Sequence, residues 1–210
     1  MRTLEHTTGG RPTVALALLS GSYGTPEDFV REGFVAAVEA RGIAAWIAMA
    51  EVRAAWFSDG SIVARIRESV VGRAHAAGVG RVWLAGVSLG GLAALAYAAR
   101  HAADLERIVL LSPYPGTREA LGEIDAAGGL DAWQPGPDPD AEREAWAWLR
   151  DRGPDAPTVD CYFASGDRFV EGQRRIAARL PAHAVHESDG GHAWEDWRRM
   201  WTDFLERNAP

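Results

Sequence analysis

The pentapeptide Gly86-Val87-Ser88-Leu89-Gly90 lies between two segments of different pattern. The run before it, Arg81 to Ala85, is typical of a buried strand, and the alanine-rich stretch from Leu89 to Arg100 is typical of a helix. Glycines two residues to either side of a serine let backbone segments pack closely around a strained strand-to-helix turn, which holds the hydroxyl at the carboxyl edge of a sheet. The first N–H groups of the helix point at the same place. Such a serine can be a nucleophile; the alternative is a glycine-rich turn without chemistry.

Strand-like and helix-like segments alternate along the rest of the chain. Continuous apolar runs predict buried strands at 13–19, 43–50, 81–86, 107–111, 158–164 and 182–187. Helical spacing predicts helices at 26–41, 61–77, 89–101, 117–127, 140–150, 169–180 and 193–207. This alternation predicts an α/β fold, a three-layer sandwich with a mainly parallel sheet of about six strands and helices on both faces. Residues 1–12 are polar and glycine-rich, which predicts a loose start.

Two loops that follow later strands carry an aspartate and a histidine. Ser165-Gly166-Asp167 follows the strand at 158–164, and Asp189-Gly190-Gly191-His192 follows the last strand. Because the carboxyl ends of parallel strands share one edge of a sheet, Ser88, Asp167 and His192 are expected to lie together there. A serine hydroxyl needs a base to take its proton, an imidazole can be that base, and a carboxylate can orient and stabilise the imidazolium. We therefore predict these three residues as catalytic.

Other acids and other interpretations compete with this set. Asp160 sits at the wrong end of its strand, while Glu187 and Asp189 share the strand or loop of His192 and would struggle to reach its ring. For Asp167 the alternative is a turn or helix-capping aspartate, and for His192 it is a solvated loop histidine.

From about Val14 to its C-terminus the chain resembles the α/β-hydrolase superfamily, and in particular its small serine carboxylesterases, thioesterases and dienelactone hydrolases. Residues 86–91 match the nucleophile motif, residues 166–170 are similar to the acid segment, and residues 190–192 are similar to the histidine loop. Some members carry the acid after the preceding strand, where this chain has Ser112-Pro113. The resemblance implies a serine hydrolase that cleaves a carboxylic ester through an acyl-enzyme. The alternatives are an acyl-thioesterase with the same triad and a non-catalytic binding protein on the same scaffold.

The resemblance also implies an oxyanion hole and a sheet order. The oxyanion would be held by the N–H groups of Leu89 and Ser22, with Tyr23 as the second choice. The family commonly has His-Gly-x in that loop, and this chain has Ser20-Gly21-Ser22. Since residues 1–12 cannot hold the two strands that many members have at the front, we expect a trimmed sheet of six parallel strands in the spatial order 2-1-3-4-5-6.

The expected substrate pocket is small. Residues 113–139 occupy the usual place of the family's lid, but they are short and rich in proline, glycine and aspartate, so we expect a small lid or none. Tyr23, Trp133 and Trp194 are predicted to contact an ester of small or medium acyl size. Trp194, Trp197 and Trp201 keep helical spacing, which favours a core position for that stripe.

Length and charge limit the other function classes. The 210 residues, 47% of them hydrophobic, suit one domain (1–210) with a short lid-like insertion at about 113–139. A net charge of −7 without a basic cluster argues against nucleic acid, and the apolar run near the N-terminus is too short to span a bilayer and lacks the flank of a signal peptide. We expect a cytoplasmic protein with a small-molecule ester or thioester as partner and no membrane contact. The motifs of metal and nucleotide sites are missing, so we expect no metal and no cofactor. Cys161 lies in an apolar run and is expected in the core. The oligomeric state stays open, with a homodimer as one possibility.

Overall fold

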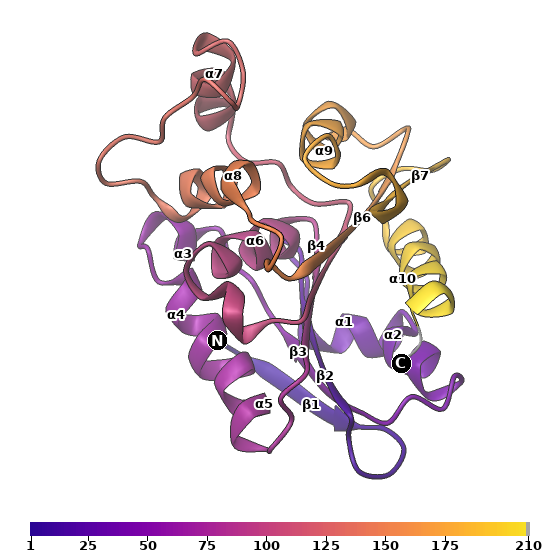
Figure 1. Cartoon of the computed structure of the whole chain (residues 1–210). Coiled ribbons are helices and arrows are strands. Elements are labelled where there is room, and N and C mark those ends of the chain that lie inside the picture. Colours follow the sequence, from indigo (N-terminus) through magenta and orange to yellow (C-terminus); the bar gives the residue numbers. More distant parts are fainter. Residues whose placement is uncertain (209–210) are drawn as a thin grey trace.

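A seven-stranded sheet forms the middle layer of the molecule (Figure 1). The computed structural model describes residues 1–208. The strands are β1 (Thr3–Thr7), β2 (Val14–Leu19), β3 (Ala45–Ala50), β4 (Val82–Val87), β5 (Arg107–Leu111), β6 (Thr158–Ala164) and β7 (Val185–Ser188). Their order is β1-β3-β2-β4-β5-β6-β7, and every pair from β3 to β7 is parallel. The predicted α/β fold and the predicted order of the six parallel strands are confirmed.

The prediction of a loose start was wrong. Residues Thr3–Thr7 form β1, which pairs antiparallel with the outer side of β3. Its side chains are mostly exposed, so it lacks the apolar run by which the other strands were predicted. An edge strand needs only a neighbour with free backbone groups, and β3 supplies them. The sheet therefore has seven strands and one antiparallel edge.

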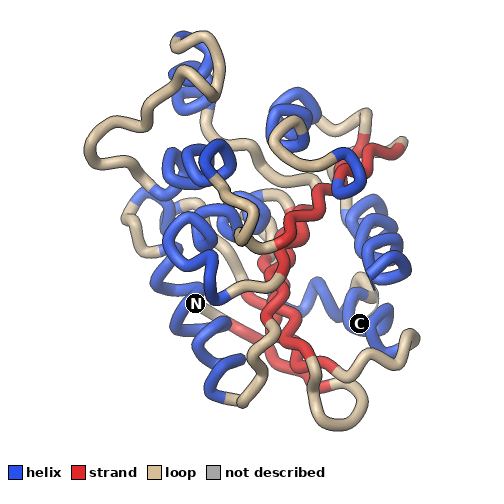
Figure 2. Tube along the Cα trace, in the orientation of Figure 1, coloured by secondary structure: helices blue, strands red, loops and turns tan. Residues whose placement is uncertain are grey.

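Helices cover both faces of the sheet, as the tube in Figure 2 shows. One face is covered by α3 (Ala55–Ser58), α4 (Ile62–Ile66), α5 (Gly72–Ala76), α6 (Leu89–His101), α7 (Arg118–Ala126), α8 (Ala141–Asp151) and α9 (Val170–Ala177). The other face is covered by α1 (Pro26–Arg31), α2 (Phe34–Glu39) and α10 (Trp194–Asn208). Among the described residues 1–208, we find no helix with the length and apolarity needed to cross a bilayer.

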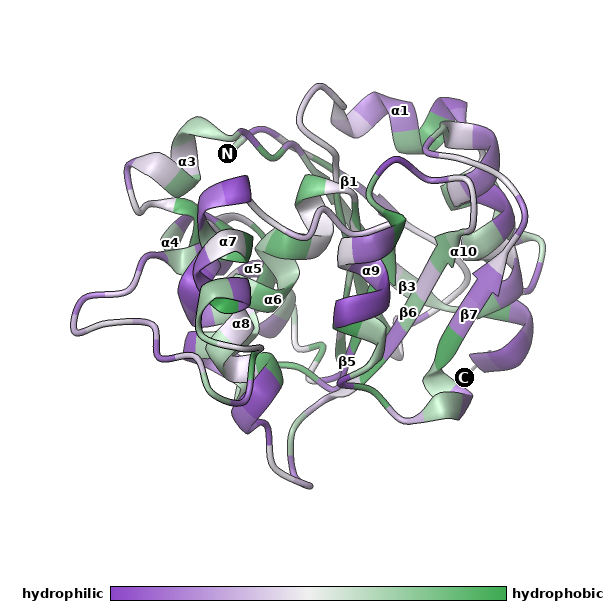
Figure 3. Cartoon of the chain, turned by 90° about the horizontal axis from the view of Figure 1, so that it is seen from above, coloured by the Kyte–Doolittle hydropathy of each residue, from purple (hydrophilic) through white to green (hydrophobic). Residues whose placement is uncertain are grey.

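The pleat of β2 explains why its whole sequence is apolar. Ala15, Ala17 and Leu19 point into the core under α6, whereas Val14, Leu16 and Leu18 point into the core under α2 and α10. Every residue of the strand is therefore buried. In Figure 3 the strands in the middle of the sheet are largely green, whereas α9, which covers one face of the sheet, is largely purple, the pattern expected for a covered sheet and a helix with a solvent-facing side.

Two predicted helices differ in the structure from a regular α-helix. The helix expected at 26–41 divides into α1 and α2 because Gly33 adopts a left-handed conformation with φ of 82° between them. The helix expected at 61–77 is continuous but contains a π-helical turn at Arg67–Val71 between α4 and α5. The short α3 was not predicted. The insertion at 113–139 contains α7, whose first turn is capped by the Thr117 hydroxyl accepting from Ala120 N–H at 3.2 Å.

Candidate active site

Ser88 occupies a strained turn between β4 and α6. Its φ of 50° and ψ of −116° are unusual for a residue with a side chain. Hydrogen bonds from three directions hold this turn. Ser88 N–H donates to the carbonyl of Leu111 at 3.0 Å, and the Ser88 carbonyl accepts from Gly91 N–H at 2.9 Å and Tyr114 N–H at 2.8 Å. The hydroxyl is therefore presented from a rigid backbone at the carboxyl edge of the sheet.

The two glycines that flank Ser88 let the strand and the helix approach each other. A Cβ atom on Gly86 would lie 2.1 Å from the carbonyl oxygen of Gly90. A Cβ atom on Gly90 would lie 2.2 Å from the carbonyl oxygen of Leu19 in β2. Neither distance is compatible with a side chain, so the turn depends on glycine at both positions.

His192 bridges Ser88 and Asp167. The Nε2 atom of His192 lies 2.9 Å from Ser88 Oγ, and its Nδ1 atom lies 2.7 Å from Asp167 Oδ2. The side chain of Asp167 is fully buried and that of His192 is 10% exposed. Asp167 follows β6 and His192 follows β7, and these parallel neighbours end side by side at the pair Ala164 and Ser188. The structure thus brings together three residues that the sequence separates widely.

A hydrogen-bond network holds the Asp167 carboxylate in its ionised form. Its Oδ1 accepts from Phe169 N–H at 2.8 Å, and its Oδ2 accepts from the Gln173 side-chain amide at 2.9 Å. Burial raises the pKa of Asp167, but the hydrogen bonds from His192, Gln173 and Phe169 N–H outweigh it, so that pKa lies below its ordinary value. The carboxylate is therefore charged at neutral pH beside the imidazole.

Sequence reasoning missed Gln173. This residue lies on α9 and is fully buried, and its Nε2 atom also lies 3.3 Å from the carbonyl of Pro113. It therefore connects the loop of Asp167 with the loop that follows β5. A signal was present in the sequence, because Gln173 shares the inward face of α9 with Ile176 and Ala177, and a polar residue at such a position needs a buried partner.

The rival carboxylates are engaged elsewhere or lie in solvent. Asp160 pairs with Arg107, and Glu187 lies 2.6 Å from Arg174. Asp189 is exposed, and its nearest side-chain partner is the Ser165 hydroxyl at 3.4 Å. None of the three contacts His192.

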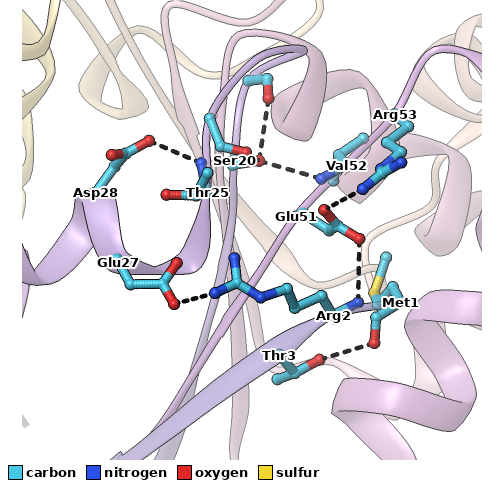
Figure 4. Close-up of polar contacts among 12 residues, drawn as sticks. Met1, Arg2, Thr3, Ser20, Thr25, Glu27, Asp28, Glu51, Val52 and Arg53 are labelled. Carbon is cyan, nitrogen blue, oxygen red and sulfur yellow. Dashed lines mark hydrogen bonds and ion pairs between the residues drawn. The ribbon is translucent and has the colours of Figure 1, made fainter.

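The loop after β2 lies directly against Ser88. A Cβ atom on Gly21 would lie 3.4 Å from the Cβ of Ser88. Ser20 anchors this loop, because its hydroxyl accepts from Val52 N–H at 3.1 Å (Figure 4). The N–H groups of Ser22 and Leu89 have no acceptor among the described residues, and both residues lie next to Ser88 in space or sequence. Two free N–H donors are what a developing oxyanion requires.

A cleft of about 240 Å³ opens beside Ser88. Its walls are formed by Gly21, Ser22, Tyr23, Gly24, Asp28, Arg168, His192, Trp194 and Trp197. Tyr23 is fully exposed, whereas Trp194 is half-buried and packs edge-on against Phe29 and Phe34. Trp197 also reaches the cleft, with its ring edge-on to that of His192 at 5.0 Å, although sequence reasoning assigned it to the core alone.

Trp133, which the sequence predicted to contact the substrate, does not line the cleft beside Ser88. Its side chain is only 3% exposed and lies in the core under α8, away from the cleft. The insertion is hydrogen-bonded to α8, where Trp146 Nε1 donates to the carbonyl of Pro115 and Arg143 donates to Glu123, and burying a large aromatic ring beside α8 is favourable. A second cleft of about 260 Å³ lies beyond Leu89, between α3 and the start of α8. Glu142 lines this second cleft and is buried.

The described residues 1–208 offer no group of three His, Cys, Asp or Glu side chains placed to hold a metal ion. Cys161 is buried in the core, as expected, and burial raises the pKa of its thiol.

Comparisons with known proteins agree with this geometry. A family model described as "Putative esterase" matches residues 62–205. A search of curated protein sequences found no significant match.

Solved structures share the fold. S-formylglutathione hydrolase (FrmB) from Staphylococcus aureus is 14% identical with a TM-score of 0.65, over 94% of this chain and 81% of that one. The fluorophosphonate-binding serine hydrolase F of the same organism is 14% identical with a TM-score of 0.66, over 94% and 84%. Carboxylesterase CesB from Bacillus subtilis is 15% identical with a TM-score of 0.57, over 98% and 85%.

Proposed function

The chain belongs to this esterase family of the α/β-hydrolase superfamily, and from that premise we propose that it is a serine hydrolase that cleaves a carboxylic ester through an acyl-enzyme on Ser88. One observation carries the proposal. A continuous line of hydrogen-bonding contacts runs from Ser88 Oγ through both ring nitrogens of His192 to the buried carboxylate of Asp167. The strained turn aims the serine hydroxyl at the open cleft, so a substrate carbonyl can reach it.

The chemistry follows from these contacts. Ser88 Oγ attacks the ester carbonyl carbon while His192 Nε2 takes the hydroxyl proton. The negative charge that develops on the carbonyl oxygen is stabilised by the N–H groups of Leu89 and Ser22. His192 then gives the proton to the departing alkoxide, the C–O bond to the leaving group breaks, and the acyl group stays on Ser88. Water, activated by His192, releases the acid by the same steps.

Asp167 acts through His192. Its carboxylate fixes the imidazole orientation and the position of the Nδ1 proton, and it stabilises the imidazolium that forms during each proton transfer. The low pKa of Asp167 supports this role, because the carboxylate keeps its charge at the pH at which an imidazole accepts protons.

The cleft supports a substrate of small or medium acyl size. Its volume of about 240 Å³ is at or below the lower end of common ligand pockets. Aromatic walls from Trp194 and Trp197 suit a compact apolar group. A thioester would meet the same triad, so oxyester and thioester panels with matched acyl groups are needed to rank the two.

The test is covalent labelling of Ser88 with a fluorophosphonate probe, read by intact mass. Wild-type protein should gain one adduct, and Ser88→Ala should gain none and lose on the order of 10⁴-fold or more in ester turnover. Ser61→Ala, which removes a hydroxyl from the start of α4, is the control and should label fully. An unlabelled wild type, or an adduct that persists in Ser88→Ala, would refute the assignment.

A further inference from the structure

Arg168 places an unpaired positive charge in the cleft beside Ser88. It directly follows Asp167 and lines the same cleft as Ser88 and His192. Within residues 1–208 its guanidinium has neither an ion-pair partner nor a hydrogen-bond partner. Arg174 and Arg199, by contrast, each pair with a carboxylate. The chain has a net charge of −7, so an unpaired arginine makes the electrostatic potential in the cleft more positive than the net charge alone would suggest.

Arg168 is exposed, and its guanidinium contacts an aromatic ring. Its guanidinium carbon lies 4.8 Å from the centre of the Phe169 ring, a cation–π contact that limits its motion. The Phe169 ring is in turn edge-on to His192, with 5.2 Å between ring centres. These two distances, 4.8 Å and 5.2 Å, place the guanidinium at most about 10 Å from the imidazole. A substrate bound at Ser88 is within reach of this charge.

No carboxylate of the cleft neutralises Arg168. Asp28 is the one acidic residue in the cleft wall, and its carboxylate is already engaged. It lies 2.5 Å from Arg31 and accepts from Thr25 N–H at 2.7 Å, with a side chain that is 12% exposed. The hydrogen-bonding groups of Arg168 are therefore free for a ligand.

We propose that the cleft selects esters whose leaving group carries an anionic group, such as a carboxylate, and that Arg168 binds this group. The inference rests on the proposed function. Since His192 must protonate the departing oxygen, the leaving group lies next to His192, which is the side of Arg168. The anion takes no part in the bond changes: Ser88 Oγ bonds to the acyl carbon, the ester C–O bond breaks, and the serine proton reaches the leaving oxygen through His192.

The experiment compares kcat/KM on matched esters for the wild type, Arg168→Gln and Arg168→Glu. 4-Acetoxybenzoate and its neutral amide, 4-acetoxybenzamide, differ in the charge of the leaving group. Mono-4-nitrophenyl adipate and its methyl ester differ in charge on the acyl side. For each pair we take the ratio of kcat/KM on the anionic ester to kcat/KM on the neutral ester. Comparing this ratio between variants cancels differences in intrinsic reactivity that do not depend on Arg168. The matched control is Arg11→Gln. Arg11 is exposed and lies in the loop before β2, at the end of that strand that is remote from the cleft.

We expect the anionic-to-neutral ratio for the acetoxybenzoate pair to fall about five-fold in Arg168→Gln, as for a partly exposed ion pair. Replacing attraction by repulsion doubles the change in free energy, so Arg168→Glu should lower the ratio about 25-fold. The ratio of the adipate pair and both ratios of Arg11→Gln should stay as in the wild type. Raising the salt from about 20 mM to about 0.5 M should weaken the wild-type preference through screening.

An unchanged ratio in both Arg168 variants would overturn the inference, and so would a change confined to the adipate pair. If either variant unfolds, inhibition of the wild type decides: 4-hydroxybenzoate should inhibit better than 4-hydroxybenzamide at low salt, and equal inhibition overturns the inference. Failure of the proposed function looks different, because wild-type Ser88 would then resist the fluorophosphonate and all esters.

Discussion

Replacing Gln173 by leucine should weaken the Asp167–His192 unit without touching the cleft. The buried carboxylate of Asp167 has three hydrogen-bond partners: Phe169 N–H, the side-chain amide of Gln173 and His192. Gln173→Leu removes the amide donor, which lies 2.9 Å from Asp167 Oδ2. A hydrogen bond to a charged group contributes about 1.5–3 kcal/mol, and its loss leaves Asp167 less well satisfied in the interior. Leucine also removes the buried amide oxygen of Gln173, which has no partner, and this offsets part of the cost. We expect a net destabilisation of about 1–2 kcal/mol at neutral pH.

The same substitution should change how stability depends on pH. The folded-state pKa of Asp167 is below its ordinary value of 3.8, so the carboxylate contributes stability above that pH and loses it as the pH falls through the folded-state pKa. Without the Gln173 donor the pKa of Asp167 rises, by about one unit for each 1.4 kcal/mol lost. Urea unfolding followed from pH 7 to pH 3 should therefore show a smaller total loss of stability in the variant. The loss begins near the ordinary pKa of 3.8 in both proteins, because the unfolded state sets that limit, and it ends at a higher pH in the variant.

Kinetics distinguishes a positioning role from a merely structural one. Gln173 does not line the cleft, so Gln173→Leu should lower kcat about ten-fold and leave KM for a neutral ester near the wild-type value. Gln134→Leu makes the same chemical change at an exposed position and serves as the control. If the variant keeps both the wild-type kcat and the wild-type pH profile of stability, Gln173 does not support Asp167. A rise in KM alone would show that Gln173 acts on the shape of the cleft instead.

Three further predictions concern other parts of the molecule. Asp167→Asn should lower turnover roughly 10⁴-fold, whereas Asp189→Asn should change it less than about two-fold, and the opposite ranking would make Asp189 the acid. Burial raises the pKa of Glu142 despite hydrogen bonds from Thr117, so its ionisation costs stability as the pH rises above its ordinary 4.5. Glu142→Gln should therefore match the wild type near pH 4 and exceed it by about 1 kcal/mol near pH 8 in urea unfolding, and a loss at pH 8 would contradict this. Finally, kcat/KM on 4-nitrophenyl esters should peak at short acyl chains, because a methylene that fits adds only about 0.8 kcal/mol and one that clashes costs more; a steady rise to long chains would contradict the small cleft.

The parallel sheet and the turn that carries Ser88 could be predicted from local sequence patterns. An apolar run covered on both faces makes a strand, and glycines at 86 and 90 are required wherever a strand and a helix approach so closely. That Ser88, Asp167 and His192 lie together could also be predicted, because parallel strands bring the loops that follow them to one edge of the sheet.

The side chains that surround this edge could not be predicted, because long-range packing places them. β1 forms because the outer edge of β3 offers unpaired backbone groups. The sequence of residues 3–7 contains no apolar pattern that would predict this pairing. Trp133 is buried because the insertion folds onto α8, and the same aromatic residue would suit a pocket wall equally well. Gln173 donates to Asp167, whereas Arg168 has no carboxylate partner within residues 1–208, and the packing of the folded chain decides both outcomes. Periodicity and turn residues act over a few neighbouring positions, so the strands, the helices and the turn at Ser88 were predictable. The partner of a polar side chain depends on the whole folded geometry, so the surroundings of the site were not.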